Sequence, residues 1–165
     1  MITKGYFPGV LGKVIELHAR YYHEHWGLDL SFETQEGREL CDFMSRFREG
    51  ADLFRAALVD GTFAGAIAID AGPRPEEGVR LRWFIVDPLF QGKGIGRRLL
   101  DEALSFCASA GYRRVYLWTF RGLDAARRLY EGAGFRLAEE NEVAQWGQSV
   151  REQMFELIRD IGDVR

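Results

Sequence analysis

The chain has 165 residues, of which 47% are hydrophobic and 13% aromatic, enough to bury roughly two-thirds of the unfolded surface in one core. We therefore expect a single domain over residues 1–165. The net charge of −3 gives no general attraction to nucleic acid or to an anionic membrane, so neither is expected as a partner. No segment has the pattern of a membrane span or a signal peptide, and the cytoplasm is the expected location.

Two helices are predicted in the first third of the chain. Apolar residues recur at helical spacing over residues 8–26 and 35–48, and a glycine follows each segment as a stop signal. Cys41 lies in the second helix and Cys107 in a later one, both among apolar residues. We expect two buried free thiols rather than a disulfide.

Strands and helices alternate in the rest of the chain. The predicted strands are residues 54–59, 62–70, 79–86, 114–120, 135–138 and 150–158, and the predicted helices are residues 95–110 and 123–132. Asp60-Gly61 predicts a hairpin turn between the first two strands, and the last two strands are expected to close the sheet as a hairpin. This order predicts an α/β fold of the α+β kind, a mixed sheet with helices on both faces.

The most informative stretch joins the strand at residues 79–86 to the helix at residues 95–110. It reads Val86-Asp87-Pro88-Leu89-Phe90-Gln91-Gly92-Lys93-Gly94-Ile95-Gly96. Unshielded N–H groups at a glycine-rich helix N-terminus favour an anion such as phosphate. A Walker loop would need Ser or Thr after Lys93, and a dinucleotide-binding loop would need glycine at Arg97. Both nucleotide motifs therefore fail.

Two segments resemble the GNAT acetyltransferase superfamily. Gln91, Gly94 and Gly96 have the spacing of its Gln/Arg-x-x-Gly-x-Gly/Ala pyrophosphate loop. Residues 123–135 resemble a helix-to-strand element of the family, and the positions in register with it are Ala126, Tyr130, Gly134 and Phe135. The resemblance implies the GNAT fold with a mostly antiparallel sheet, acetyl-CoA as cosubstrate, and no metal.

The resemblance also implies roles for individual residues. Those implied to bind the coenzyme are Ile85, Val86, Gln91, Gly92, Lys93, Gly94, Ile95, Gly96 and Arg97. Pro88 cannot continue the strand ladder, which opens a gap against residues 114–120. In that gap the main-chain N–H of Val86 would polarise the acetyl carbonyl, and Tyr130 would protonate the departing thiolate as an amine attacks directly. The alternative for Tyr130 is packing in the core.

One position departs from the family pattern. Leu123 stands where the family carries Asn, and a leucine side chain cannot hydrogen-bond the coenzyme. The alternative to an N-acetyltransferase is therefore a non-catalytic CoA-binding sensor or regulatory partner. Residues 5–9, 22–28 and 123–135 also resemble the acetyltransferase domain that follows a MarR-type regulator domain in some bacterial proteins.

The acceptor side carries weaker signals. His23-Glu24-His25 ends the first helix, in a region that shapes the acceptor pocket in the family, and would supply a base or substrate contacts. A polar helix terminus is the alternative. Arg80 and Arg82 are predicted to share a strand face with Phe84, where they would pair acidic helix residues or bind a substrate carboxylate.

The expected acceptor is a small-molecule or peptide amine. Cationic recognition by the two strand arginines would favour amines that also carry a carboxylate over polyamines. No metal site is expected, because the three histidines of the first helix form no compact ligand set. An open edge strand would suit a homodimer.

Overall fold

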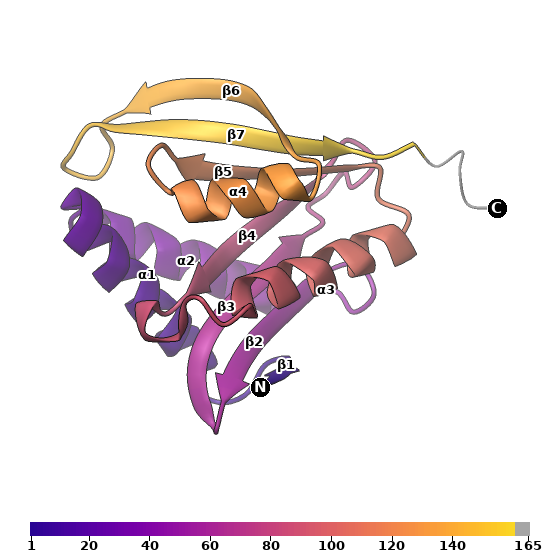
Figure 1. Ribbon diagram of the computed structural model, residues 1–165, viewed down its shortest axis with the longest axis horizontal. Coiled ribbons are helices and arrows are strands. Elements are labelled where there is room, and N and C mark those ends of the chain that lie inside the picture. The colour runs from indigo at the N-terminus through magenta and orange to yellow at the C-terminus, as the bar shows by residue number, and fades with distance from the viewer. Residues whose placement is uncertain (161–165) are drawn as a thin grey trace.

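The computed structural model describes residues 1–160 and contains a seven-stranded sheet in the order β1-β2-β3-β4-β5-β7-β6 (Figure 1). The strands are β1 (Ile2–Lys4), β2 (Leu53–Val59), β3 (Thr62–Asp70), β4 (Val79–Val86), β5 (Arg114–Phe120), β6 (Arg136–Val143) and β7 (Val150–Ile158). The helices are α1 (Val10–Trp26), α2 (Leu30–Ser45), α3 (Ile95–Ser109) and α4 (Asp124–Gly132), with a 3-10 turn, η1, at Pro88–Phe90. Neighbouring strands are antiparallel except β4 and β5, which α3 connects in parallel.

Helices cover both faces of the sheet, with α3 and α4 on one side and α1 and α2 on the other (Figure 1). Each face has its own apolar cluster. On one side Leu99 and Cys107 of α3 are fully buried against the central strands, and on the other Val14 of α1 and Phe43 of α2 are fully buried. The predicted mixed, mostly antiparallel sheet with helices on both faces is confirmed. None of the helices in residues 1–160 has the length and apolarity to cross a bilayer.

A third apolar cluster connects distant parts of the chain. It joins the start of α2, the end of β5 and the β6–β7 hairpin, and its buried members are Leu28, Phe32, Phe120, Trp146 and Val150. Trp146 also donates its indole N–H to Gln35 Oε1 at 2.8 Å, and its carbonyl accepts the N–H of Asp29 at 3.1 Å. The C-terminal hairpin is thereby fixed to the two N-terminal helices.

Several boundaries differ from the sequence prediction. Helix α2 begins at Leu30 rather than at residue 35, because the side chain of Asp29 caps it by accepting the N–H of Ser31 at 3.0 Å. The short strand β1 has too few residues to show a sequence pattern. Cys107 is buried as predicted, but the prediction for Cys41 is wrong: it is exposed because it lies one residue past the buried stripe residue Leu40 of α2.

Strand β4 contains one extra residue. Between the pairs Ala66↔Ile85 and Ala68↔Arg82, β4 has one residue more than β3, which is a β-bulge. Trp83 lies in this bulge with φ of 47°, in the left-handed region that a bulky residue rarely adopts. The bulge bends β4 and changes its twist near the middle of the strand.

The bulge also changes which side chains share a face. Trp83 packs in the apolar cluster of α1 and α2, whereas Phe84 packs on the other side with its ring 5.9 Å from that of Tyr130. The prediction that Phe84 shares a face with Arg80 and Arg82 is therefore wrong. A regular strand alternates strictly, and the extra residue breaks this alternation after Arg82.

Strands β4 and β5 separate soon after they begin. They pair in register at Val79↔Val115 and Arg80↔Tyr116, and no later residues of the two strands are paired. Beyond these positions the bulged part of β4 diverges from β5. The predicted gap between the end of β4 and residues 114–120 is present, and it begins earlier than Pro88, near the bulge.

The close approach of β3 and β4 gives a stability prediction. A Cβ on Gly65 would lie 2.5 Å from Ile85 O, a backbone atom that cannot move aside, so Gly65→Ala is expected to lose about 1–3 kcal/mol of unfolding free energy. Gly12 lies in α1 with open space around its Cβ position, so the control Gly12→Ala is expected to gain roughly 0.5–1 kcal/mol. Urea unfolding measures both changes. Equal stability of the two variants would contradict the tight β3–β4 contact.

Candidate active site

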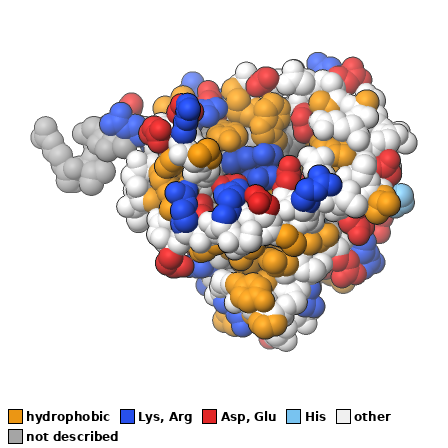
Figure 2. All heavy atoms as spheres, turned by 180° about the vertical axis from the view of Figure 1, so that it is seen from behind, with side chains coloured by type: hydrophobic (Ala, Val, Ile, Leu, Met, Phe, Trp, Pro, Cys, Tyr) orange, Lys and Arg blue, Asp and Glu red, His pale blue; other side chains and the backbone are white. Residues whose placement is uncertain are grey.

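A cavity of about 1000 Å³ extends through the gap between β4 and β5. One wall comes from the glycine loop, the start of α3 and helix α4, and the opposite wall comes from α1 and α2. Figure 2 shows Lys and Arg side chains gathered around a hollow on the far side of the molecule, with acidic side chains beside them. Residues from elements on both faces of the sheet therefore line one cavity.

The glycine loop exposes backbone donors at the start of α3. Gly94 is the N-cap with φ of 77°, and the first helical bond is Arg98 N–H to Gly94 O at 3.1 Å. The N–H groups of the three residues between them therefore have no acceptor within the helix. A Cβ on Gly96 would lie 3.3 Å from Leu129 Cδ1, so glycine there lets α3 approach α4 closely. This geometry fits an anionic ligand such as a pyrophosphate.

Most of the residues predicted to bind a coenzyme line this cavity. They are Ile85, Val86, Gln91, Gly92, Gly94, Ile95, Gly96 and Arg97. Lys93 does not line it; its ammonium lies over the Phe90 ring at 5.4 Å from the centroid. Gln91 donates its side-chain amide to Val86 O at 3.3 Å and so connects the loop to the end of β4.

The end of β4 turns one backbone donor toward the gap. Asp87 donates its N–H to Ala64 O at 2.8 Å on the β3 side. Because successive residues of a strand direct their N–H groups to opposite sides, the N–H of Val86 points away from β3 and into the gap. The carbonyl of Ile85 instead faces Gly65 of β3. Ile85 thus contributes its side chain to the cavity, and Val86 contributes a backbone donor.

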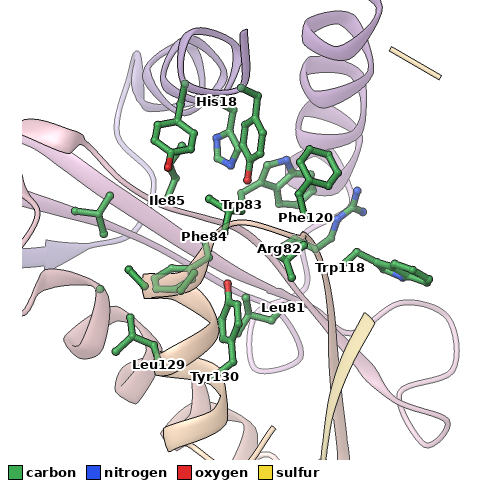
Figure 3. Close-up of a pocket in the computed structure, with 18 of the residues that line it drawn as sticks. His18, Leu81, Arg82, Trp83, Phe84, Ile85, Trp118, Phe120, Leu129 and Tyr130 are labelled. Carbon is green, nitrogen blue, oxygen red and sulfur yellow. The ribbon is translucent and has the colours of Figure 1, made fainter. Parts of the chain in front are cut away.

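Tyr130 combines a packed ring with an open hydroxyl. The side chain is 5% exposed, and its ring lies 5.8 Å from that of Phe135. The hydroxyl has no hydrogen-bond partner among residues 1–160 and points into the cavity (Figure 3). Burial raises the pKa of Tyr130, so the phenol keeps its proton at neutral pH. A proton donor therefore faces the cavity from α4.

Arg82 is paired with two carboxylates. Its guanidinium lies 2.6 Å from Glu39 of α2 and 3.4 Å from Asp70, and its side chain is 12% exposed. Burial alone would raise the pKa of Asp70, but hydrogen bonds and charge from Arg46, with the charge of Arg82, hold it below its usual value. Of the two roles predicted for Arg82, pairing with an acidic helix residue is the one observed.

Arg80 has no such partner. It lines the cavity, and its Nε is buried without a hydrogen-bond partner among the described residues. Burial and the neighbouring charge of Arg82 lower the pKa of Arg80. Glu152 of β7 lines the same cavity, and burial raises its pKa although the charge of Arg80 opposes this. A buried cation without a paired carboxylate is unfavourable, so this site favours an anionic ligand.

The predicted His23-Glu24-His25 group lies outside the described lining of the cavity. The imidazole of His23 bonds Leu28 O at 2.9 Å, and that of His25 bonds Tyr21 O at 2.8 Å. The alternative, a polar helix terminus, describes their observed environment. Within residues 1–160, no group of three or more His, Cys, Asp or Glu side chains is arranged to hold a metal ion.

The wall formed by α1 and α2 has no motif in the sequence. Its lining residues are His18, Tyr21, Tyr22, Phe32, Gln35, Glu36 and Glu39. The first three recur at helical spacing, which is a detectable stripe but resembles an ordinary core-facing one. Only the gap opposite them, which depends on the bulge in β4, distinguishes this stripe from a packed core.

Comparison with known proteins assigns the family. Residues 12–135 match the model of the Acetyltransferase (GNAT) family, and the chain belongs to this family. N-acetylaspartate synthetase from Homo sapiens is 31% identical over 121 residues, 73% of this chain and 40% of that protein. N-alpha-acetyltransferase RimI from Mycobacterium tuberculosis is 43% identical over 77 residues, 46% of this chain and 47% of that protein. The chain spans about half the length of the curated relatives it matches.

Solved structures support the same fold. A putative acetyltransferase from Salmonella typhimurium, solved with its cofactor acetyl-CoA, has a TM-score of 0.74 to this chain at 16% identity. The match covers 100% of this chain and 97% of that chain. The GNAT fold implied by the sequence resemblance is therefore confirmed.

The anion site at the start of α3 can be tested through Gly94. We expect Gly94→Val to weaken acetyl-CoA binding by about tenfold or more, because the side chain strains a positive φ and obstructs the backbone donors. Gly111 follows α3 with φ of 76° and equally open surroundings, so Gly111→Val imposes the same strain away from the cavity. Calorimetric titration of both folded variants measures the effect. Equal affinities in the two variants would contradict the site.

Proposed function

We propose that this chain is an N-acetyltransferase that moves the acetyl group of acetyl-CoA to an amine. The observation that carries the proposal is the divergence of β4 from β5, which leaves the Val86 N–H facing a cavity between an anion site and a buried phenol. The anion site would hold the coenzyme pyrophosphate, with Arg97 beside it. The pantetheine arm would then extend along the end of β4 and bring the thioester to Val86.

Val86 and Tyr130 have complementary roles in this proposal. The amine nitrogen forms a bond to the thioester carbon while the Val86 N–H stabilises the negative charge that develops on the carbonyl oxygen. The carbon–sulfur bond then breaks, and the Tyr130 hydroxyl gives its proton to the leaving thiolate. The raised pKa of Tyr130 keeps the phenol protonated before the reaction, and it also makes the phenol a weaker acid toward the thiolate. The attacking nitrogen loses one proton to give the neutral amide, and the phenolate recovers a proton from solvent.

We further propose that the acceptor amine carries a carboxylate. Arg80 offers the cavity a guanidinium without a protein carboxylate, and a substrate carboxylate would supply the missing charge and hydrogen bonds. The names of the N-acetylaspartate synthetases indicate a product with carboxylates, which supports the same substrate class. The name of RimI indicates acetylation of an α-amino group. An amino acid or a short acidic peptide combines these features.

A CoA-binding sensor without turnover is the second candidate. It is favoured by Leu123, whose side chain packs in the apolar cluster around Trp146 and provides no capping hydrogen bond for α4. A sensor would bind acetyl-CoA and release no thiol with any amine. An enzyme would release CoA in proportion to acetylated product. Thiol detection across a panel of amines decides between the two.

Tyr130→Phe tests the proton donor. The ring packing is kept and the proton is lost, so kcat is expected to fall about 10²–10⁴-fold while acetyl-CoA affinity is unchanged. Tyr112→Phe removes a hydroxyl that bonds Ala51 O at 2.7 Å outside the cavity, and it should leave kcat unchanged. Single-turnover kinetics measure the chemical step. Wild-type turnover in Tyr130→Phe would show that this residue only packs.

Arg80→Gln tests the acceptor class. Wild-type protein is expected to prefer an amino acid over its decarboxylated amine, and Arg80→Gln should remove about 10- to 100-fold of that preference in kcat/KM. Arg82→Gln is expected to lower thermal stability instead, because it leaves Asp70 and Glu39 without a shared partner. A polyamine as the best substrate of the wild-type protein would contradict the carboxylate assignment.

A further inference from the structure

His18 is a buried histidine that the proposed roles of Val86, Tyr130 and Arg80 leave unused. It lies in α1, is 5% exposed, and lines the cavity. Its Nδ1 lies 2.8 Å from Val14 O. A carbonyl oxygen can only accept a hydrogen bond, so Nδ1 carries the proton. In the neutral ring, Nε2 therefore holds a free lone pair.

The free nitrogen faces the cavity rather than another side chain. Nε2 of His18 has no hydrogen-bond partner in residues 1–160. It is also not among the fully buried side-chain atoms without a partner, so it remains accessible from the cavity that His18 lines. Figure 3 shows His18 entering the cavity from α1, while Tyr130 enters from α4 on the opposite side of β4. Val86, which would hold the acetyl carbonyl, lines the same cavity as His18 and Tyr130.

Burial shifts the pKa values of His18 and Tyr130 in opposite directions. Burial lowers the pKa of His18 below 6.5, although the charge of Glu36 and the bond to Val14 oppose this, so the imidazole is neutral at pH 7. Burial raises the pKa of Tyr130, which keeps its proton. A neutral base and a protonated acid on opposite walls are the arrangement that acid–base catalysis requires.

We infer that His18 is the general base of the proposed acetyl transfer and takes the proton that the attacking amine must lose. This inference rests on the proposed function. As the nitrogen–carbon bond forms, the nitrogen becomes positively charged, and one of its protons passes to Nε2 of His18. The carbon–sulfur bond breaks, and the sulfur takes the proton of Tyr130. Solvent then removes the proton from His18 and restores the one on Tyr130, so the products are the N-acetyl amine and CoA.

Other titratable groups around the cavity influence the proton that His18 would accept. Those that line it are Glu36, Glu39, Arg80, Arg82, Arg97, Asp124, Arg128 and Glu152, together with the phenols Tyr21, Tyr22 and Tyr130. Glu36 is the carboxylate whose charge raises the pKa of His18. It would therefore stabilise the imidazolium that forms briefly after proton transfer. The ring of Tyr22 stacks at 6.1 Å on that of His18 and helps to fix its orientation.

His18→Asn is the direct test, because the asparagine amide can still donate to Val14 O but has no lone pair in the place of Nε2. We expect acetyl-CoA affinity to stay unchanged and kcat to fall about 10²–10⁴-fold. In the wild-type protein, kcat/KM should fall as pH decreases through the pKa of His18, and this acid limb should be absent in the variant. Added imidazole should restore part of the turnover.

His25→Asn is the matched control. His25 lies on the same helix and bonds a carbonyl four residues earlier at 2.8 Å, but it is exposed and outside the described cavity lining. This variant should keep both turnover and the acid limb. Turnover near the wild-type level in His18→Asn, or an acid limb that persists in this variant, would overturn the role of His18. Either result would leave the proposed acetyl transfer itself standing. A wild-type protein that binds acetyl-CoA but acetylates no amine would instead overturn the proposed function.

Two further measurements do not depend on the folding of His18→Asn. The imidazole ¹⁵N shifts of the wild-type protein at pH 7 should show Nδ1 protonated and Nε2 bare, and the reverse tautomer would overturn the inference. Glu36→Gln removes the charge that raises the pKa of His18, so the acid limb should move to lower pH. An acid limb that stays in place in the folded variant would show that another group accepts the proton.

Discussion

The arrangement of the candidate site depends on the short pairing between β4 and β5. Two parallel strands as long as β4 and β5 would normally hydrogen-bond to each other along most of their residues and so satisfy their backbone groups. Here the pairing ends after Arg80↔Tyr116, and the bulge at Trp83 turns the rest of β4 away. The Val86 N–H is left to face a cavity, and helices on both faces of the sheet contribute to one site. The left-handed φ of Trp83 is a local backbone strain located beside the candidate site.

The two arginines of β4 that line the cavity have different surroundings. Arg82 and Arg46 share Asp70, and this network fixes the start of β4 to α2. Arg80, two residues earlier and on the same face, has no protein partner and remains available to an anion. The two arginines look equivalent in the sequence. The position of α2 separates their roles, because Glu39 comes within ion-pair distance of Arg82 and of no other described arginine.

Most of the fold follows from local sequence patterns. The amphipathic helices, the Asp60-Gly61 turn and the glycine loop before α3 depend on nearby residues, and apart from the earlier bounds of α2 they are close to where the patterns predict them. The bulge in β4 depends instead on how two strands pack, so regular alternation gives the wrong face for Phe84. The same limit applies to His18, which becomes a candidate base only because the gap opposite it is not filled. The dense group at residues 23–25 is more conspicuous in the sequence but lies outside the described cavity lining.

The central claim is that the Val86 N–H binds the acetyl carbonyl in the gap between β4 and β5. Amide NMR of the protein with acetyl-CoA and with CoA tests it, since the two ligands differ only in the acetyl group. We expect the Val86 amide proton to move downfield with acetyl-CoA and to a smaller extent with CoA. The amide of the neighbouring residue Ile85, whose carbonyl faces β3, should respond equally to both ligands. An identical response of Val86 to acetyl-CoA and CoA would contradict the claim.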